Sequence, residues 1–148
     1  MLRTQCLLGA LVLLVSLGPG CDGETEHDGG YNENAGHPCT SPANCYPGLD
    51  AGALSGDVVC LDRVPNGYCT HLCQDDTDCC AVPGECETGH PQVCAPFESA
   101  PEKYCLLSCE DQWLGGLDSS GYCQRYADSA FGCRSTGGGS ENRKVCMP

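Results

Sequence analysis

The sequence predicts a small disulfide-rich fold, in which short β-hairpins and loops form tandem modules with at most one short helix near residues 102–114. Residues 39–148 hold 14 cysteines, a density typical of small exported proteins. The same segment has eight Leu, six Val, two Phe and no Ile, too few core-forming side chains to offset the entropy of the chain. Disulfides, each contributing about 2–4 kcal/mol, would supply the missing stability.

Short strands are favoured over helices because glycine occurs in each of three loops that run from a cysteine to a Val-Cys pair, at 45–60, 86–94 and 133–146. The single helix is expected over 102–114. There Cys105 and Cys109 are four residues apart, and Leu106 and Trp113 would lie where they can cover the bridges.

The first residues have the features of a secretory signal peptide. Arg3 is followed by an uncharged, mostly aliphatic stretch over 7–17 and by the small residues Gly18 and Gly20. This stretch is about half the roughly 20 residues that a membrane-spanning helix needs. We therefore expect residues 1–20 to be removed and the mature protein not to be an integral membrane protein.

The residues before Cys21, Leu-Gly-Pro-Gly, resemble a bacterial lipobox, in which the cysteine is diacylated and becomes the new N-terminus. Ordinary signal peptidase cleavage is the alternative. Lipidation of Cys21 leaves an even number of cysteines for bridges. The resemblance implies an exported protein held by lipid in the bacterial cell envelope, at the outer membrane or cell surface more than at the inner membrane, although Asp22 resembles an inner-membrane retention signal.

The charge of the chain is strongly acidic. Without Arg3 it keeps 6 basic against 20 acidic residues, a formal net charge of −14. Such a charge argues against nucleic acid and anionic lipid surfaces as partners. Residues 22–38 contain five acids and no Lys or Arg, so residues 21–38 are expected to be the lipidated cysteine and a flexible tether.

An internal repeat follows the tether. The pattern C-x2-P-x2-C occurs at 39–45 and 80–86, Tyr-Cys-x3-Cys occurs at 68–73 and 104–109, and Val-Cys occurs at 59–60 and 93–94. These blocks predict one module over 39–79 and a second over 80–148. The second ends in a partial third copy, with Gly-Tyr-Cys at 121–123 and Val-Cys at 145–146.

All cysteines of the two modules are expected to form disulfides: Cys39, Cys45, Cys60, Cys69, Cys73, Cys79, Cys80, Cys86, Cys94, Cys105, Cys109, Cys123, Cys133 and Cys146. Their connectivity is open, and closure of each module on itself is one possibility. The adjacent Cys79 and Cys80 are expected to have different partners and to lie where the modules join.

The segment from Cys73 to Cys79 reads C-x2-D-x-D-C and is followed by Cys86 and Cys94. It resembles the cysteine-rich repeats of uncharacterised bacterial lipoproteins. The resemblance covers about residues 36–148. It implies an architecture and no particular activity.

Two possible metal sites in this segment each have a structural explanation that is favoured over metal binding. Cys69, His71, Cys73 and Cys79 could bind zinc, but exported thiols oxidise and the spacing favours disulfides. Three aspartates follow Cys73: Asp75, Asp76 and Asp78. They could bind calcium, but capping of a turn is favoured. We therefore expect no metal, cofactor or small-molecule substrate.

No catalytic set is evident, so the function predicted is that of a non-enzymatic binding or surface-structure module with an unidentified protein partner. Trp113 and Leu114 lie in the longest stretch between cysteines and are candidate contact residues, because Trp is enriched at binding hot spots. Covering a small core is the other role open to them. The alternative function is a secreted protease inhibitor that inserts the loop 46–59 into an active site.

Overall fold

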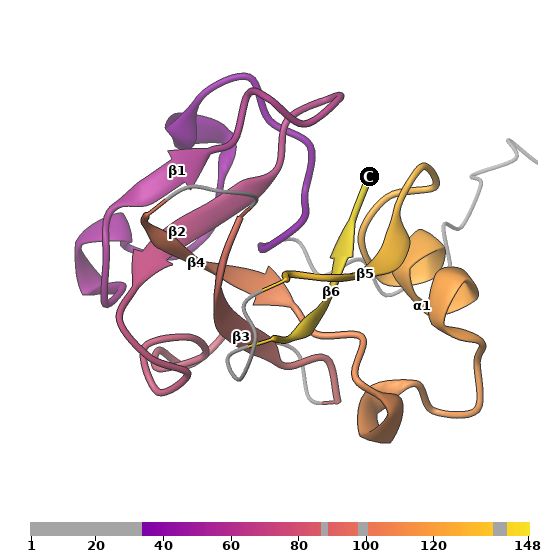
Figure 1. Cartoon of the computed structure of the whole chain (residues 1–148). Helices are drawn as coiled ribbons and strands as arrows, with labels where there is room; N and C mark the ends of the chain where they lie inside the picture. Colours follow the sequence, from indigo (N-terminus) through magenta and orange to yellow (C-terminus); the bar gives the residue numbers. More distant parts are fainter. Residues whose placement is uncertain (1–33, 87–88, 98–100, 138–141) are drawn as a thin grey trace, which may run out of the picture.

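Two antiparallel hairpins form the main sheet of the protein (Figure 1). The computed structural model describes residues 34–86, 89–97, 101–137 and 142–148, so the predicted signal peptide and Cys21 lie outside the described residues. The sheet has the order β1-β2-β4-β3, formed by β1 (Val58–Cys60), β2 (Cys69–Cys73), β3 (Gln92–Pro96) and β4 (Lys103–Leu107).

A second, two-stranded sheet lies beside the first. Strands β5 (Gly132–Ser135) and β6 (Lys144–Met147) are antiparallel, and helix α1 (Ser119–Tyr126) packs against β5. The sheets are joined by a bridge between Ser108 and Val145 and by a 3.0 Å hydrogen bond from the Cys109 amide to the Lys144 carbonyl. Three short 3-10 turns complete the fold: η1 (Pro42–Asn44), η2 (Ala51–Ala53) and η3 (Asp111–Trp113).

The two main hairpins have the same register on the residues that the repeat aligns. Cys60 faces Cys69 in the first hairpin, and Cys94 faces Cys105 in the second. Facing cysteines are not bonded to each other, because each has a partner elsewhere. The expected small, disulfide-rich fold of short strands and loops is therefore confirmed.

The prediction of a helix over 102–114 is wrong, because that segment contains β4 and η3. Cys105, Leu106 and Leu107 are fully buried between β2 and β3, and a central strand needs apolar side chains on both faces. A short apolar run of this kind cannot be told from a buried helix by its periodicity. The four-residue spacing of Cys105 and Cys109 does not indicate a helix, because the two cysteines bond to different partners.

The helix lies instead in the partial third copy of the repeat. The Asp118 carboxylate accepts hydrogen bonds from the amides of Ser120 and Gly121, at 3.1 and 2.9 Å, and so caps the first turn of α1. Tyr122 and Cys123 are consequently helical, whereas the matching Tyr-Cys pairs of the first two copies lie in or next to strands. The third copy keeps only the hairpin of β5 and β6.

All 14 cysteines of the modules are paired in seven disulfides: Cys39–Cys60, Cys45–Cys69, Cys73–Cys94, Cys79–Cys105, Cys80–Cys86, Cys109–Cys133 and Cys123–Cys146. Cys79 and Cys80 have different partners, as expected. Two bridges join residues on either side of the predicted junction at 79–80, and β2 also pairs with β4 across it. Closure of each module on itself is therefore not the pattern observed.

The end of the predicted tether belongs to the fold. Ala35 is fully buried, the amide of Gly36 donates to the carbonyl of Cys69, and the amide of Cys69 donates to the carbonyl of His37, both at 2.9 Å. The Asn34 side-chain amide also donates to the carbonyls of Gly84 and Glu85. Residues 34–38 thus lie along the start of β2, and the expected tether is shorter by this segment.

Side chains from both hairpins and from α1 meet in the largest core cluster. Leu106, Leu107, Tyr122, Phe131 and Val145 lie in it and are almost fully buried. A smaller cluster forms around Tyr46 and Leu54 beside the first two bridges. Division into small clusters explains why disulfides must add to the stability of so few apolar side chains.

Candidate functional site

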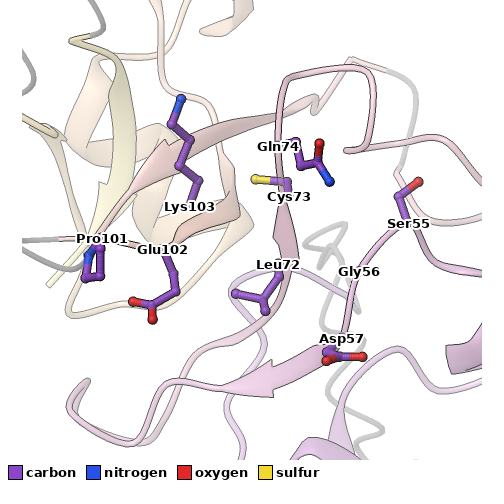
Figure 2. A pocket seen from close by; sticks show the side chains of 9 residues that line it. All are labelled: Ser55, Gly56, Asp57, Leu72, Cys73, Gln74, Pro101, Glu102 and Lys103. Atoms are coloured by element: carbon purple, nitrogen blue, oxygen red, sulfur yellow. The ribbon is translucent and has the colours of Figure 1, made fainter.

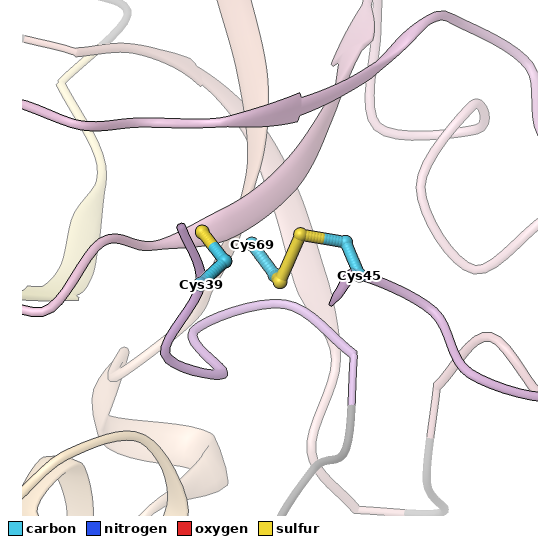
Figure 3. Close-up of side chains that lie close together, drawn as sticks. All are labelled: Cys39, Cys45 and Cys69. Carbon is cyan, nitrogen blue, oxygen red and sulfur yellow. A yellow bond between two sulfur atoms is a disulfide. The ribbon is translucent and has the colours of Figure 1, made fainter. Parts of the chain in front are cut away.

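Within the part of the chain that the structure describes, cysteine sulfur atoms form three groups close enough together to bind a metal ion if they were thiolates. Cys39, Cys45 and Cys69 have their sulfur atoms within 4.8 Å of one another, and Figure 3 shows the Cys45–Cys69 bond with Cys39 beside it. Two neighbouring disulfides produce this cluster. Because a bridged sulfur is not a thiolate, these atoms are not available as zinc ligands.

His71 and Glu85 form a fully buried pair. The Nε2 atom of His71 lies 2.9 Å from Oε1 of Glu85, and Nδ1 lies 2.8 Å from the carbonyl oxygen of Leu72. The carboxylate of Glu85 and the carbonyl of Leu72 are both acceptors, so the His71 ring lies between two hydrogen-bond acceptors. His71 is thus buried in the core, and the Cys105 sulfur that lies within 4.8 Å of this pair is bridged to Cys79 and is not a thiolate.

Glu85 also fixes the loop that carries it. Its oxygens accept hydrogen bonds from the amides of Cys80 and Val82, at 2.7 and 3.1 Å. Burial acts to raise the pKa of Glu85, but the hydrogen bonds from His71 and from the two amides outweigh it and lower the pKa below its usual value. Sequence reasoning missed Glu85, because nothing near it in the sequence indicates its distant partner on β2.

The acidic residues after β2 cap a turn, as expected. The carboxylate of Asp78 accepts from the amides of Gln74 and Asp75, and that of Asp75 accepts from Thr77. The hydrogen bonds from Thr77 lower the pKa of Asp75. Their oxygens are therefore committed to the local backbone and do not converge on one point.

Asp76 has a different role, because it joins β3 and the β5–β6 hairpin. One oxygen accepts from the Cys94 amide at 2.9 Å, and the other pairs with Arg143. Arg143 also pairs with Glu110 at 2.7 Å, and this contact lowers the pKa of Glu110. No local pattern in the sequence indicates this link, which spans 67 positions between Asp76 and Arg143.

An open groove of about 550 Å³ lies at the end of β2, between the residues that precede β1 and those at the start of β4. In Figure 2, residues 55–57 line one side, residues 72–74 lie in the middle, and Pro101, Glu102 and Lys103 line the other side. The side chains of Glu102 and Lys103 point to opposite sides of the chain. Since Cys73 is bridged to Cys94, its sulfur is not a nucleophile.

Trp113 is the one large hydrophobic side chain exposed among the described residues, with 38% of its surface accessible. It ends η3, where its amide donates to the Glu110 carbonyl at 2.8 Å. Leu114 and Leu117 follow and pack partly against the main core. Of the two candidate contact residues, Trp113 is turned outward and Leu114 is half covered.

The loop predicted for the protease-inhibitor alternative, residues 46–59, is buried at two positions and exposed at most of the others. Tyr46 and Leu54 are buried in the smaller core cluster, and residues 51–53 form η2. A protease reads side chains along an extended, accessible segment. Tyr46 and Leu54 are not accessible to a protease, whereas residues 50–53 of the same loop are exposed.

Among the residues that the structure describes, no helix has the length and apolar character needed to cross a membrane. The disulfides and the cysteine content fit an extracytoplasmic location, where thiols are oxidised. No family model, no curated protein and no solved structure matches the chain.

Proposed function

We propose that the chain is a lipid-anchored, non-enzymatic binding module outside the cytoplasm, and that Trp113 is its main contact residue. The observation that carries this proposal is the exposure of Trp113 on a turn that hydrogen bonds and ion pairs hold in place. A chain so poor in apolar side chains loses stability by leaving its single tryptophan accessible, and burial against a partner would recover that free energy.

The segment that carries Trp113 is held from both sides. Glu110 pairs with Arg143, and Asp111 pairs with Lys144 at 2.8 Å. After Trp113 the amide of Leu117 donates to the Leu114 carbonyl at 2.9 Å. A contact residue on such a segment loses little conformational entropy on binding.

The chemistry around Trp113 indicates the kind of partner. Glu110 and Asp111 beside Trp113 are paired with Arg143 and Lys144, so the negative charge that would attract a basic partner is that of the chain as a whole, which is strongly acidic. We therefore expect a protein partner with an apolar cleft edged by Lys or Arg, since a cation can also lie over the indole ring. An anionic lipid surface would be repelled.

A non-enzymatic role is supported by the state of the nucleophiles and bases. Every described cysteine is bridged, His71 is buried beside Glu85, and the His90 ring lies 3.1 Å from the Tyr122 hydroxyl. Burial raises the pKa of Tyr122 to about 12, so the hydroxyl stays protonated at neutral pH and no phenolate is available as a general base.

The binding role can be tested with a photoreactive phenylalanine analogue at position 113 in the organism that expresses the protein. We expect discrete cross-linked species from position 113 and none from position 125, a surface position on α1. Equal products from both positions, or none from either, would contradict the role of Trp113.

The anchor has a separate test in the intact mass of the mature protein. We expect a diacylated or triacylated species that begins at Cys21 and is 14 hydrogens lighter than its reduced form, because seven bridges remove two hydrogens each. An unmodified Cys21 at the N-terminus would refute lipidation and leave the bridges unaffected.

A further inference from the structure

Four of the six described Lys and Arg side chains are occupied by other groups. Arg143 and Lys144 form ion pairs, Arg125 lies 5.5 Å from the centre of the Tyr126 ring, and Lys103 acts electrostatically on Asp75. Arg63 and Arg134 remain, of which Arg63 acts electrostatically on Tyr104. Neither forms an ion pair with a carboxylate of the described residues, in a chain where acids outnumber bases.

These two arginines line the same pocket, although they are 71 positions apart in the sequence. The pocket has a volume of about 220 Å³, and its other lining residues are Pro65, Pro148 and the buried Val64, Phe97 and Met147. Three segments meet there: the loop between β1 and β2, the residue after β3, and the β5–β6 hairpin. Two cations thus stand beside an apolar surface.

The backbone that carries the two arginines is ordered, and both side chains are exposed. In the loop, the Val64 amide donates to the Leu61 carbonyl at 3.3 Å, and the Gly67 amide donates to the Val64 carbonyl at 2.8 Å. On β5, Arg134 faces Val145 and follows Cys133, which is bridged to Cys109. A ligand would therefore meet a site whose backbone is already ordered.

We propose that this pocket binds a carboxylate that carries one apolar ring or branched chain, either as a free small molecule or as the C-terminal residue of a peptide. A guanidinium binds a carboxylate with two parallel hydrogen bonds. A cavity of about 150 Å³ holds a benzene ring, so this pocket has room for a ring with a carboxylate beside it. The site is separate from the Trp113 segment and does not depend on its role.

Phenylacetate is a suitable probe, with phenylacetamide as its neutral counterpart. Titration of the isotope-labelled mature protein, followed by NMR, should move the amide signals of Val64, Arg134 and Met147. The expected dissociation constant is on the order of 1 mM for a ligand of this size. Phenylacetamide should bind at least about tenfold more weakly, because it cannot form the charged hydrogen bonds.

Variants assign the effect to the two arginines. Arg63→Gln and Arg134→Gln should each weaken phenylacetate binding about tenfold or more. Arg125→Gln removes the same charge outside the pocket and should leave the affinity unchanged. Retained signal dispersion and the absence of free thiols would show that each variant is folded.

A tripeptide that ends in Phe with a free carboxylate distinguishes the two sources of the ligand. Tighter binding than phenylacetate, lost on amidation, assigns the pocket to a peptide terminus; weaker binding assigns it to a free carboxylate. The proposal is overturned if phenylacetate and phenylacetamide bind alike, if neither binds at 10 mM, ~10 times the expected constant, or if Arg125→Gln weakens binding as much as the pocket variants.

Discussion

Replacement of Glu85 by alanine should be among the most destabilising single changes outside the cysteines. The substitution leaves the buried His71 ring without its partner at Nε2 and removes the acceptor of the Cys80 and Val82 amides. Each buried amide without a partner costs about 1–3 kcal/mol. Breaking one side of a buried ion pair costs about 3–5 kcal/mol, which we take as the expected loss in free energy of unfolding.

Guanidinium unfolding of the oxidised protein at pH 7, followed by circular dichroism, measures this loss. Native-state hydrogen exchange gives a local measurement at the amides of Cys80 and Val82, whose protection should fall about 10²–10³-fold. The matched control is Glu102→Ala, since Glu102 is exposed, and it should change stability by less than about 0.5 kcal/mol. Equal effects of the two variants would refute the assignment of a buried ion pair.

The pH dependence has a defined sign. Because the pKa of Glu85 is lowered in the folded protein, Glu85 contributes stability above the ordinary carboxylate value of about 4.3, and this contribution is lost as the pH falls through the folded value. Glu85→Ala should therefore lose less stability on acidification than the parent chain. A parallel acid decline in both proteins would contradict this.

Three further changes test particular contacts of the fold. Gly56→Ala should cost more than about 2 kcal/mol, because the new Cβ would lie 2.1 Å from the Leu72 carbonyl oxygen, whereas Gly132→Ala meets open space and should cost much less; similar melting temperatures would contradict this. Asp118→Ala should lower the free energy of unfolding by about 1 kcal/mol through loss of the cap of α1, and unchanged hydrogen exchange in the helix would contradict that role. Asn34→Ala should raise proteolysis before Cys39, because two hydrogen bonds to backbone carbonyls are lost; an unchanged cleavage pattern would show that residues 34–38 are held by other contacts.

Much of the fold could be predicted because its signals are local or compositional. Cysteine density and scarce apolar side chains indicate a disulfide-rich fold without reference to geometry. The aligned blocks around Cys60 and Cys69, and around Cys94 and Cys105, predict two related units, and both became hairpins of the same register. Turn capping at Asp78 was predictable because its partners lie within four residues.

The candidate sites were less predictable, because they depend on residues brought together from distant segments. Trp113 could be singled out by its residue type and its place between cysteines, but its exposure depends on how the main core packs. Arg63 and Arg134 line one pocket, and no spacing pattern in the sequence indicates that they lie close together.

By itself, the sequence determined the class of the fold, the acidic charge, the repeat and the expectation that the module cysteines form bridges. Only the tertiary structure decided which cysteines pair. The 14 thiols are chemically identical, so the sequence does not distinguish their partners, and proximity in space selects them. The tertiary structure also decided that residues 103–107 form a central strand. A short apolar run fits a helix or a strand equally well until β2 and β3 offer hydrogen bonds on both sides.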